Sequence, residues 1–400
     1  MALTGRWRRA WLVLSVTLLA ACAVPSGPRP PVTPSPTSGV AATQTPAAPA
    51  TVLGVATMTE GRCQCSTLHL ISVAGSELGS VTLDAGAQPP LAAGPQGIYY
   101  VLGYQLMRLG ADGSTTEVGT VARAPGGDGS AVRPAPELGS LAVAPGADQW
   151  AYLQSISSGG NQTEQVWLGE ANRGPRLLVS TEQSPGAPST EFPGGWTYQL
   201  MGWAGGYLVL AQMPNGSGSF ASLALEVSLV NPQTGTETVV SNSQNCPISA
   251  VGASGGYVCF QQGGGQATEL VTEAAGISTG AWPLPSGSGY GAAAFDRSGK
   301  QILFSNCEGC GASPSAADLG SQMEVLDTET GSIRQLGAAG LVSDAWLANG
   351  QIVATQYSQL AYARRGSPPL SQVVLVDPAS GQVTAITDDS TSQFAGIATS

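Results

Sequence analysis

Short runs of alternating apolar and polar residues follow one another along most of the chain, and turn signals separate them. Gln372–Val376 and Gln382–Ile386 are two such runs. Alternation with a period of two predicts β-strands with one buried face. The pattern therefore predicts a protein of many short strands and many turns.

One kind of turn recurs between these runs. Three segments have Asn or Asp followed four residues later by Gly: Asn231 with Gly235, Asp327 with Gly331, and Asp377 with Gly381. The first side chain bonds nearby backbone, and the final position needs a positive φ, which glycine adopts without strain. These segments predict tight turns between antiparallel strands.

Weaker copies of this turn extend the series toward the N-terminus. They end at Gly75, Gly113, Gly174 and Gly276. The seven turn glycines between Gly75 and Gly381 are about 51 residues apart on average. A four-stranded blade of a β-propeller needs roughly 40 to 50 residues, so the spacing predicts one blade for each turn.

A second series of turns precedes each of the last six members of the first. These turns lie at Gly97, Asp148, Gly206, Gly256, Gly299 and Gly350, each directly before an apolar run. We interpret them as the turns between the innermost and second strands of a blade. The first blade lacks such a turn, so we expect Phe394–Ala398 to supply its innermost strand and close a ring.

The sequence therefore predicts an all-β fold, a seven-bladed β-propeller of four-stranded blades over residues 51–400. Phe295-Asp296-Arg297-Ser298-Gly299-Lys300 resembles the Ser-Pro-Asp-Gly-Lys turn of the Tol-system and WD40-like periplasmic propellers. The resemblance implies the fold and no particular activity. A pair of β-sandwiches, or a ring of six or eight blades, are the alternatives.

The first 21 residues have the pattern of an export signal. Arg6, Arg8 and Arg9 precede an apolar run, residues 10–21, that is shorter than the roughly 20 residues of a membrane span. Leu19-Ala20-Ala21-Cys22 resembles the lipobox of bacterial lipoproteins, which implies that Cys22 is acylated and begins the mature chain. An ordinary secretory signal and a twin-arginine signal are the alternatives. Residues 22–50, rich in Pro, Ser and Thr, are interpreted as an extended tether.

Composition limits the partners. The chain has 15 basic and 26 acidic residues, a formal net charge of −11, and no concentration of cationic residues. Nucleic acid recognition requires cationic surface, so no nucleic acid partner is expected. The expected location is the extracytoplasmic side of a cell membrane, with the lipid on Cys22 as the anchor.

Six further cysteines form an even set in a chain expected to be exported, which favours disulfides. Cys246 and Cys259 flank one predicted hairpin, and a bond between them is expected. Cys307 and Cys310 allow a bond across a tight turn, whereas Cys63 and Cys65 would close a strained ring. A four-thiolate zinc site from the two closely spaced pairs is the alternative, and no metal is expected.

Conventional catalytic groups are scarce. His69 is the single histidine and lies within an alternating strand, so it is interpreted as a surface or packing residue. Gly252-Ala253-Ser254-Gly255-Gly256 matches the letters of a nucleophile elbow, but it precedes a strand where that motif requires a helix. The prediction therefore includes no catalytic residue and no cofactor.

Trp203 and Trp346 both stand just before an inner turn. Equivalent positions in two blades favour packing between neighbouring blades. The alternative is a pair of aromatic platforms near one mouth of the central channel, able to stack on a sugar or peptide. We predict a lipid-anchored propeller that binds a protein or envelope polymer; the alternative is an envelope enzyme or a glycan or peptide sensor at the channel mouth.

Overall fold

A computed structural model of the chain describes most of residues 52–399. The described residues are 52–60, 66–83, 90–122, 138–158, 161–171, 173–183, 196–214, 224, 226–241, 246–252, 255–263, 266–274, 277–285, 288–308, 321–357, 371–387 and 392–399. All of them belong to one compact unit, Ala48–Ser400. The expected signal segment 1–21, the expected tether 22–50 and Cys22 lie outside the described residues.

The described chain is all β and forms seven four-stranded antiparallel sheets, numbered here as blades in chain order. Blade one consists of β28 (Ser392–Thr399), β1 (Val52–Glu60), β2 (Ser66–Ile71) and β3 (Glu77–Leu83). Blade two consists of β4 (Leu91–Gly94), β5 (Gly97–Leu102), β6 (Gln105–Gly110) and β7 (Thr115–Thr120). Blade three consists of β8 (Leu138–Val143), β9 (Gln149–Ser158), β10 (Asn161–Glu170) and β11 (Arg173–Gln183).

The remaining four blades repeat the same order. Blade four consists of β12 (Trp196–Ala204), β13 (Tyr207–Pro214), β14 (Glu226–Val230) and β15 (Glu237–Ser241). Blade five consists of β16 (Ile248–Val251), β17 (Tyr257–Gly263), β18 (Gln266–Ala274) and β19 (Ile277–Pro283). Blade six consists of β20 (Ser288–Phe295), β21 (Gln301–Glu308), β22 (Ser321–Asp327) and β23 (Ile333–Leu336). Blade seven consists of β24 (Leu341–Trp346), β25 (Ile352–Tyr357), β26 (Ser371–Val376) and β27 (Val383–Ala385).

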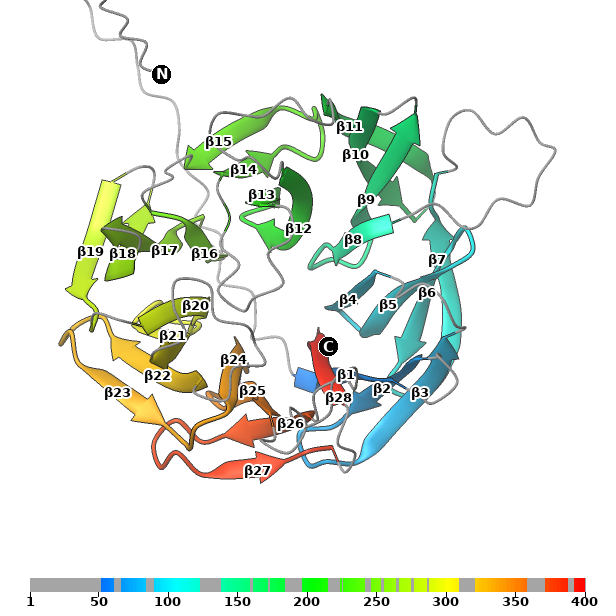
Figure 1. The fold of residues 1–400 in the computed structure, drawn as a ribbon. Coiled ribbons are helices and arrows are strands. Elements are labelled where there is room, and N and C mark those ends of the chain that lie inside the picture. The colour runs from blue at the N-terminus through cyan, green and yellow to red at the C-terminus, as the bar shows by residue number, and fades with distance from the viewer. Residues whose placement is uncertain are drawn as a thin grey trace, which may run out of the picture. The chain divides into compact units, whose positions relative to one another are not determined.

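The blades are arranged in a ring, with the first strand of each sheet toward the centre (Figure 1). In blade one the central position belongs to β28, which pairs antiparallel with β1 over Val52–Thr59. The fold is therefore a β-propeller of four-stranded blades, and the alternative of two β-sandwiches is wrong. No helix in the described part of the chain has the length and apolar character of a membrane span.

The outer turns have the chemistry expected from the sequence. Asp327 Oδ1 accepts hydrogen bonds from the backbone N–H groups of Glu329 at 3.0 Å and Thr330 at 2.8 Å. Gly331 has a φ of +72° and donates its N–H to the Asp327 carbonyl. The two related turns repeat this geometry, with φ of +73° at Gly235 and +70° at Gly381. A local hydrogen-bond pattern thus fixes each hairpin.

The prediction that Gly174 ends an outer turn is wrong. Gly174 lies inside β11, which begins at Arg173, and its φ is not in the left-handed region. In the hairpin between β10 and β11, Glu170 pairs with Arg173, so only two residues connect the strands and the turn ends before Gly174. Gly276 lies outside the described residues.

Apolar side chains pack between neighbouring blades and form separate clusters around the ring. One cluster joins blades two and three through buried side chains that include Tyr99, Trp150 and Tyr152. Another joins blades five and six through Phe260, Tyr290 and other residues. Each blade is thus stabilised mainly by burial against its two neighbours.

Candidate functional site

A cavity of about 1050 Å³ opens on the blade ends that carry the inner and outer turns. Four consecutive blades line it. Blade five contributes residues from all four of its strands, and blade six contributes the end of β20 and the turn after it. Blades four and seven contribute β12, β13 and β24. The cavity therefore follows the groove between blades five and six, from the innermost strands to the outermost strand β19. We call it the blade-five groove.

Trp203 and Trp346 both line the blade-five groove at its inner end. Trp203 lies on β12 and also packs against the apolar cluster between blades three and four. Trp346 lies on β24 and also packs against the cluster between blades six and seven. Both indole nitrogens are buried and have no hydrogen-bond partner among the described residues. The two tryptophans thus contact blade cores and the groove.

The equivalent residues in other blades explain the packing role. Val143, Val251 and Phe295 also directly precede an inner turn, and each packs against an apolar cluster. An apolar residue at this position therefore serves as a blade contact around the ring. Blades four and seven carry tryptophan there, which is large enough to contact the core and line the groove.

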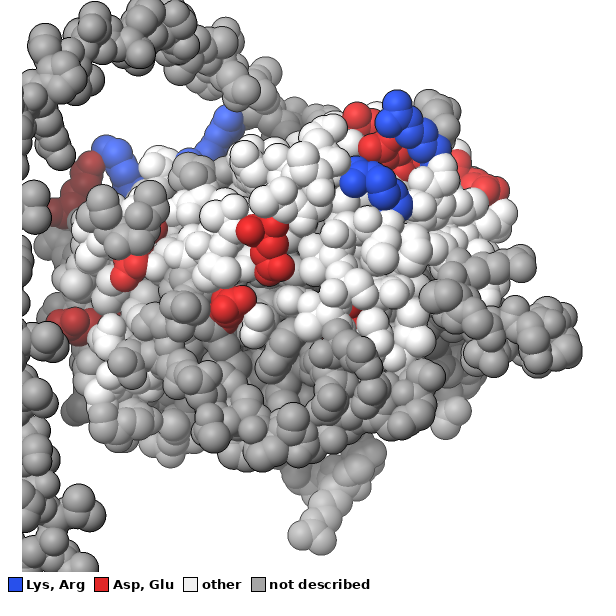
Figure 2. Space-filling view, turned by 90° about the horizontal axis from the view of Figure 1, so that it is seen from above, with Lys and Arg blue, Asp and Glu red and all other residues white. Residues whose placement is uncertain are grey.

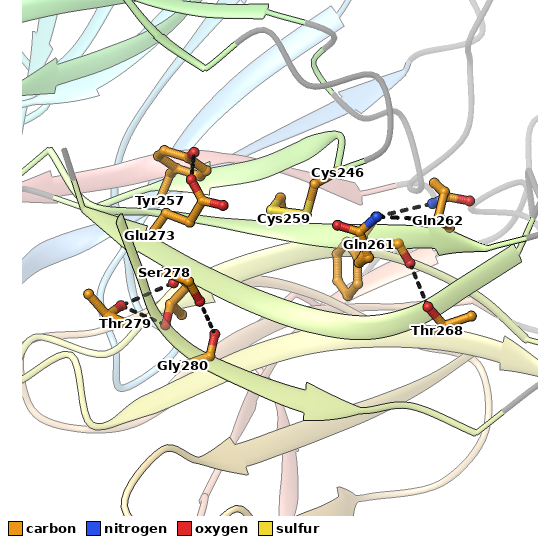
Figure 3. The surroundings of a disulfide bond; sticks show 12 residues. Cys246, Tyr257, Cys259, Gln261, Gln262, Thr268, Glu273, Ser278, Thr279 and Gly280 are labelled. Atoms are coloured by element: carbon orange, nitrogen blue, oxygen red, sulfur yellow. Dashed lines mark hydrogen bonds between the residues drawn. A yellow bond between two sulfur atoms is a disulfide. The ribbon is translucent and has the colours of Figure 1, made fainter. Parts of the chain in front are cut away.

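The middle of the blade-five groove holds a tyrosine–carboxylate pair. The hydroxyl of Tyr257, on β17, donates to Oε2 of Glu273, on β18. The two side chains point toward one another near the turn end of blade five (Figure 3). Glu273 is half-buried, whereas Tyr257 is 2% exposed. The paired strands β17 and β18 place these residues opposite each other, since Tyr257 and Glu273 are register partners.

Threonines continue the lining beside this pair. The Thr279 hydroxyl lies 2.9 Å from Thr272 Oγ1 and 3.1 Å from the Thr272 carbonyl oxygen. Ser249, on β16, accepts the backbone N–H of Ala293 at 3.0 Å, which links the innermost strands of blades five and six. These hydroxyls therefore already have partners within the protein.

The turn between β20 and β21 forms the blade-six wall. Asp296 Oδ1 accepts the Gln301 N–H at 2.9 Å, and Oδ2 accepts the Ser298 hydroxyl at 2.5 Å. Arg297 in the same turn is exposed. Lys300, the single lysine of the sequence, forms a 2.6 Å ion pair with Glu329, which ties the inner turn to the outer turn. The Glu329 carboxylate raises the pKa of Lys300.

Trp282, on the outermost strand β19, marks the outer end of the groove. It is half-buried, and a Cβ atom at Gly331 would lie 3.2 Å from its Cδ1. Glycine in the blade-six outer turn therefore leaves space for this indole. Sequence reasoning missed Trp282 because no turn motif adjoins it, and its only signal is a large aromatic residue on a predicted edge strand.

A half-buried carboxyl lies next to the inner end of the groove. Asp344 precedes the lining residues Ala345 and Trp346, at a bulge in the pairing of β24 with β25. Its Oδ2 accepts the Thr355 hydroxyl at 2.7 Å. Burial raises the pKa of Asp344 to about 7, because a low-dielectric site disfavours the charged form.

The predicted disulfide between Cys246 and Cys259 is confirmed, with a Cα–Cα distance of 5.2 Å. It joins the segment before β16 to β17, in the middle of blade five (Figure 3). Cys307 is fully buried and also takes part in a disulfide. Cys63, Cys65 and Cys310 lie outside the described residues. Within the described part of the chain, no cluster of His, Cys, Asp or Glu is arranged to hold a metal.

The single histidine, His69, lies on β2 of blade one and is not among the residues that line the groove. His69 Nδ1 is 3.1 Å from Glu77 Oε2 across the strand pair β2–β3. Hydrogen bonds from the side chains of Ser80 and His69 lower the pKa of Glu77, and the bond from Ser80 has the larger effect. Gly255 donates its N–H to the Gly252 carbonyl at 2.9 Å in the connection between β16 and β17. Ala253 and Ser254 lie outside the described residues.

Charged side chains are sparse on the described surface. Figure 2 shows few red and blue residues among white ones on one side of the molecule, with one group of both signs at the upper right. The described atoms on this side thus form no continuous basic patch. This distribution agrees with the low charge content of the sequence.

Comparison with known proteins gives similarity of fold only. No protein-family model and no curated protein matches the sequence. The putative TolB from Agrobacterium tumefaciens is 12% identical, with 85% of this chain and 89% of that chain covered and a TM-score of 0.38. The propeller domain of the Trilobed protease from Pyrococcus furiosus is 8% identical, with coverage of 84% and 96% and a TM-score of 0.47. The WD40 domain of SCAP from fission yeast is 8% identical, with coverage of 83% and 86% and a TM-score of 0.41.

Proposed function

We propose that the protein is a binding module of the cell envelope, exported, anchored through a lipid on Cys22, and engaging its partner at the blade-five groove. The observation that supports this most is the groove itself. Its volume of about 1050 Å³ is at the upper end of the range for ligand sites, and it has three tryptophans along its walls. Large aromatic side chains contribute much of the energy at binding interfaces.

The lining favours binding over catalysis. The described residues of the lining include no histidine, cysteine or lysine, and both carboxylate oxygens of Asp296 accept hydrogen bonds within its own turn. Glu273 is already bonded to Tyr257. A binding role needs only shape and contact area from these residues.

The Cys246–Cys259 disulfide supports export, because such bonds persist mainly in oxidising compartments. The anchor is tested with Cys22→Ser. We expect the variant in the culture medium and the wild-type chain in the membrane fraction. Retention of the variant in the membrane would contradict the anchor while leaving the groove proposal to its own test.

The groove is tested by capture of partners after cross-linking in cells. We expect Trp203→Ala with Trp346→Ala to lose the captured partner when capture is compared at equal amounts of folded protein, because both side chains also pack against blade cores. Leu102→Ser is the matched control, because Leu102 is 50% exposed and belongs to blade two, outside the groove. Equal capture by all three proteins would contradict a binding role for the groove.

A further inference from the structure

The blade-five groove has the dimensions of a site for an extended chain. It is lined from β16, the innermost strand of blade five, to β19, the outermost. Three strand spacings of about 4.8 Å give a length of about 14 Å. A polyproline II segment rises about 3.1 Å per residue, so about five residues would span this distance.

Aromatic side chains occur at both ends of the groove. Trp203 and Trp346 line the inner end, and Trp282 lines the outer end. Beside Trp203, the side chains of Met201 and Tyr207 are exposed by 38% and 42%. Among the described residues these are two of five large apolar side chains with such exposure, and both belong to the blade-four hairpin that borders the groove. Exposed Met and aromatic residues are typical of peptide-binding surfaces.

The polar side chains of the lining are largely engaged within the protein. Thr272 and Thr279 bond each other, and Ser249 accepts a backbone N–H. The Thr328 hydroxyl donates to the Lys300 carbonyl at 2.9 Å. A glycan, which needs many directed hydrogen bonds, finds few free partners here. A ligand with few donors loses little when it leaves water for this lining.

One charged group in the groove keeps a free acceptor. Glu273 receives the Tyr257 hydroxyl on Oε2, and no described residue bonds its Oε1. Asp296 adds a second negative charge to the lining, against the single positive charge of exposed Arg297. The walls are therefore net negative, in a chain of net charge −11.

We propose that the blade-five groove binds an extended, proline-rich peptide that carries an arginine. This rests on the proposed binding function. Proline lacks the N–H donor and is pre-organised as polyproline II, and such segments dock in aromatic-lined grooves. The arginine guanidinium would pair with Glu273 and stack on a neighbouring indole, since arginine combines charge with a planar face.

The test uses fluorescein-labelled synthetic peptides on the purified propeller region of the chain with its disulfides intact. The main probe is a ten-residue peptide of eight prolines and two arginines. One control peptide replaces the prolines by alternating Gly and Ser, and another replaces the arginines by Gln. We expect saturable binding of the main probe, at least about tenfold weaker binding of the Gly-Ser peptide, and about threefold weaker binding of the Gln peptide.

Variants assign the binding to the groove. Trp282→Ala is expected to weaken binding of the main probe by about tenfold or more. Glu273→Gln is expected to weaken the arginine probe about threefold and leave the Gln peptide unchanged, because only the former has a charge to pair. Val239→Ser is the matched control, because Val239 is 50% exposed, lies on β15 and is outside the groove.

The outcomes separate this inference from the proposed function. Equal binding of the proline and Gly-Ser peptides, or no effect of Trp282→Ala, would overturn the peptide proposal. Saturable binding of neutral oligosaccharides in place of the peptide, lost in Trp282→Ala, would also overturn it while supporting a binding function. Loss of cellular partner capture in Trp203→Ala with Trp346→Ala would keep the binding function even if every peptide fails.

Discussion

The junction between blades two and three and the junction between blades five and six place a tryptophan on opposite sides. In the first, Trp150 extends from the second strand of blade three and is 1% exposed. In the second, Trp282 extends from the outermost strand of blade five and is half-buried at the groove. The position equivalent to Trp150 in blade six is Ile302, a smaller residue.

Both indoles pack against glycines, but the space at the glycine of the facing blade differs between the two junctions. A Cβ atom at Gly169 would lie 2.1 Å from Trp150, and one at Gly119 would lie 2.2 Å from it. Trp150 therefore fills its junction completely. At Trp282, a Cβ atom at Gly280 on the same strand would lie 2.3 Å from the indole, but one at Gly331 across the junction would lie 3.2 Å from it. The difference is therefore on the facing blade, where Gly331 leaves the indole at the wall of an open groove. The same pair of residue types thus closes one junction and lines a cavity in another.

The largest expected effect separates these two tryptophans. Trp150→Ala should lower the free energy of unfolding by about 3 to 5 kcal/mol, because it leaves a cavity in a filled junction. Trp282→Ala should cost less than about half of that, because its indole is already partly in solvent. Urea unfolding followed by circular dichroism measures both values. Similar losses in the two variants would contradict the distinction between a closed and an open junction.

The second effect concerns the bond that holds blade five beside the groove. Replacing both Cys246 and Cys259 by Ala should lower the free energy of unfolding by about 2 to 4 kcal/mol, since the bond restricts the unfolded chain. The measurement is thermal unfolding without reductant, because reductant would also open the disulfide of Cys307. An unchanged melting temperature would show that apolar packing alone holds this blade.

The third effect is a pH dependence at the inner end of the groove. Because the pKa of Asp344 is raised to about 7 in the fold, its contribution to stability is fully present below about pH 4 and is lost as the pH rises to about 7. Asp344→Asn should remove this loss, about 1 to 3 kcal/mol. The measurement is urea unfolding of both proteins at pH 4, 5.5 and 7.5.

Asp377 provides a control of opposite sign. Hydrogen bonds from the backbone N–H groups of Ser380 and Ala379 lower its pKa in the fold, so its contribution to stability falls as the pH drops through the acidic range. Asp377→Asn should therefore leave the slope between pH 5.5 and 7.5 unchanged. The Asp344 assignment would be wrong if Asp344→Asn and the wild-type chain kept parallel curves across that interval.

The smallest expected loss of stability is for a substitution at Gly331, the glycine beside Trp282. Gly331→Ala should cost about 1 to 2 kcal/mol because φ is +72° there, and it should also perturb the fluorescence of Trp282, which it approaches. Gly75→Ala has a φ of +85° with no atom within 4 Å of the added Cβ, so it should cost about the same without the spectral change. Identical spectra in the two variants would place Trp282 away from this turn.

The turn chemistry explains how much of the fold was accessible from sequence. Asp327 with Gly331 and Asp377 with Gly381 are local patterns, and each determines its hairpin by bonds within a few residues. Gly174 was misread because glycine also occurs within strands, where it signals no turn. The Cys246–Cys259 disulfide could be predicted from the sequence because both residues belong to one hairpin.

Only some of the groove residues could be predicted from the sequence. Trp203 and Trp346 were identified because they occupy a repeated position relative to an inner turn. Trp282 and the Tyr257–Glu273 pair were missed, because their role depends on which junction is left open between blades. Whether a junction is filled or open depends on side-chain volumes from two blades about 50 residues apart in the chain, so no local sequence pattern predicts it.

Lys300 gives the chain a chemical property of practical use. It is the only side-chain amine in the sequence, and it directly follows the lining residue Gly299. An amine-reactive reagent therefore modifies one side chain, which stands at the border of the groove. A dye or photoreactive group attached there would report occupancy, or capture a bound partner, without any engineered residue.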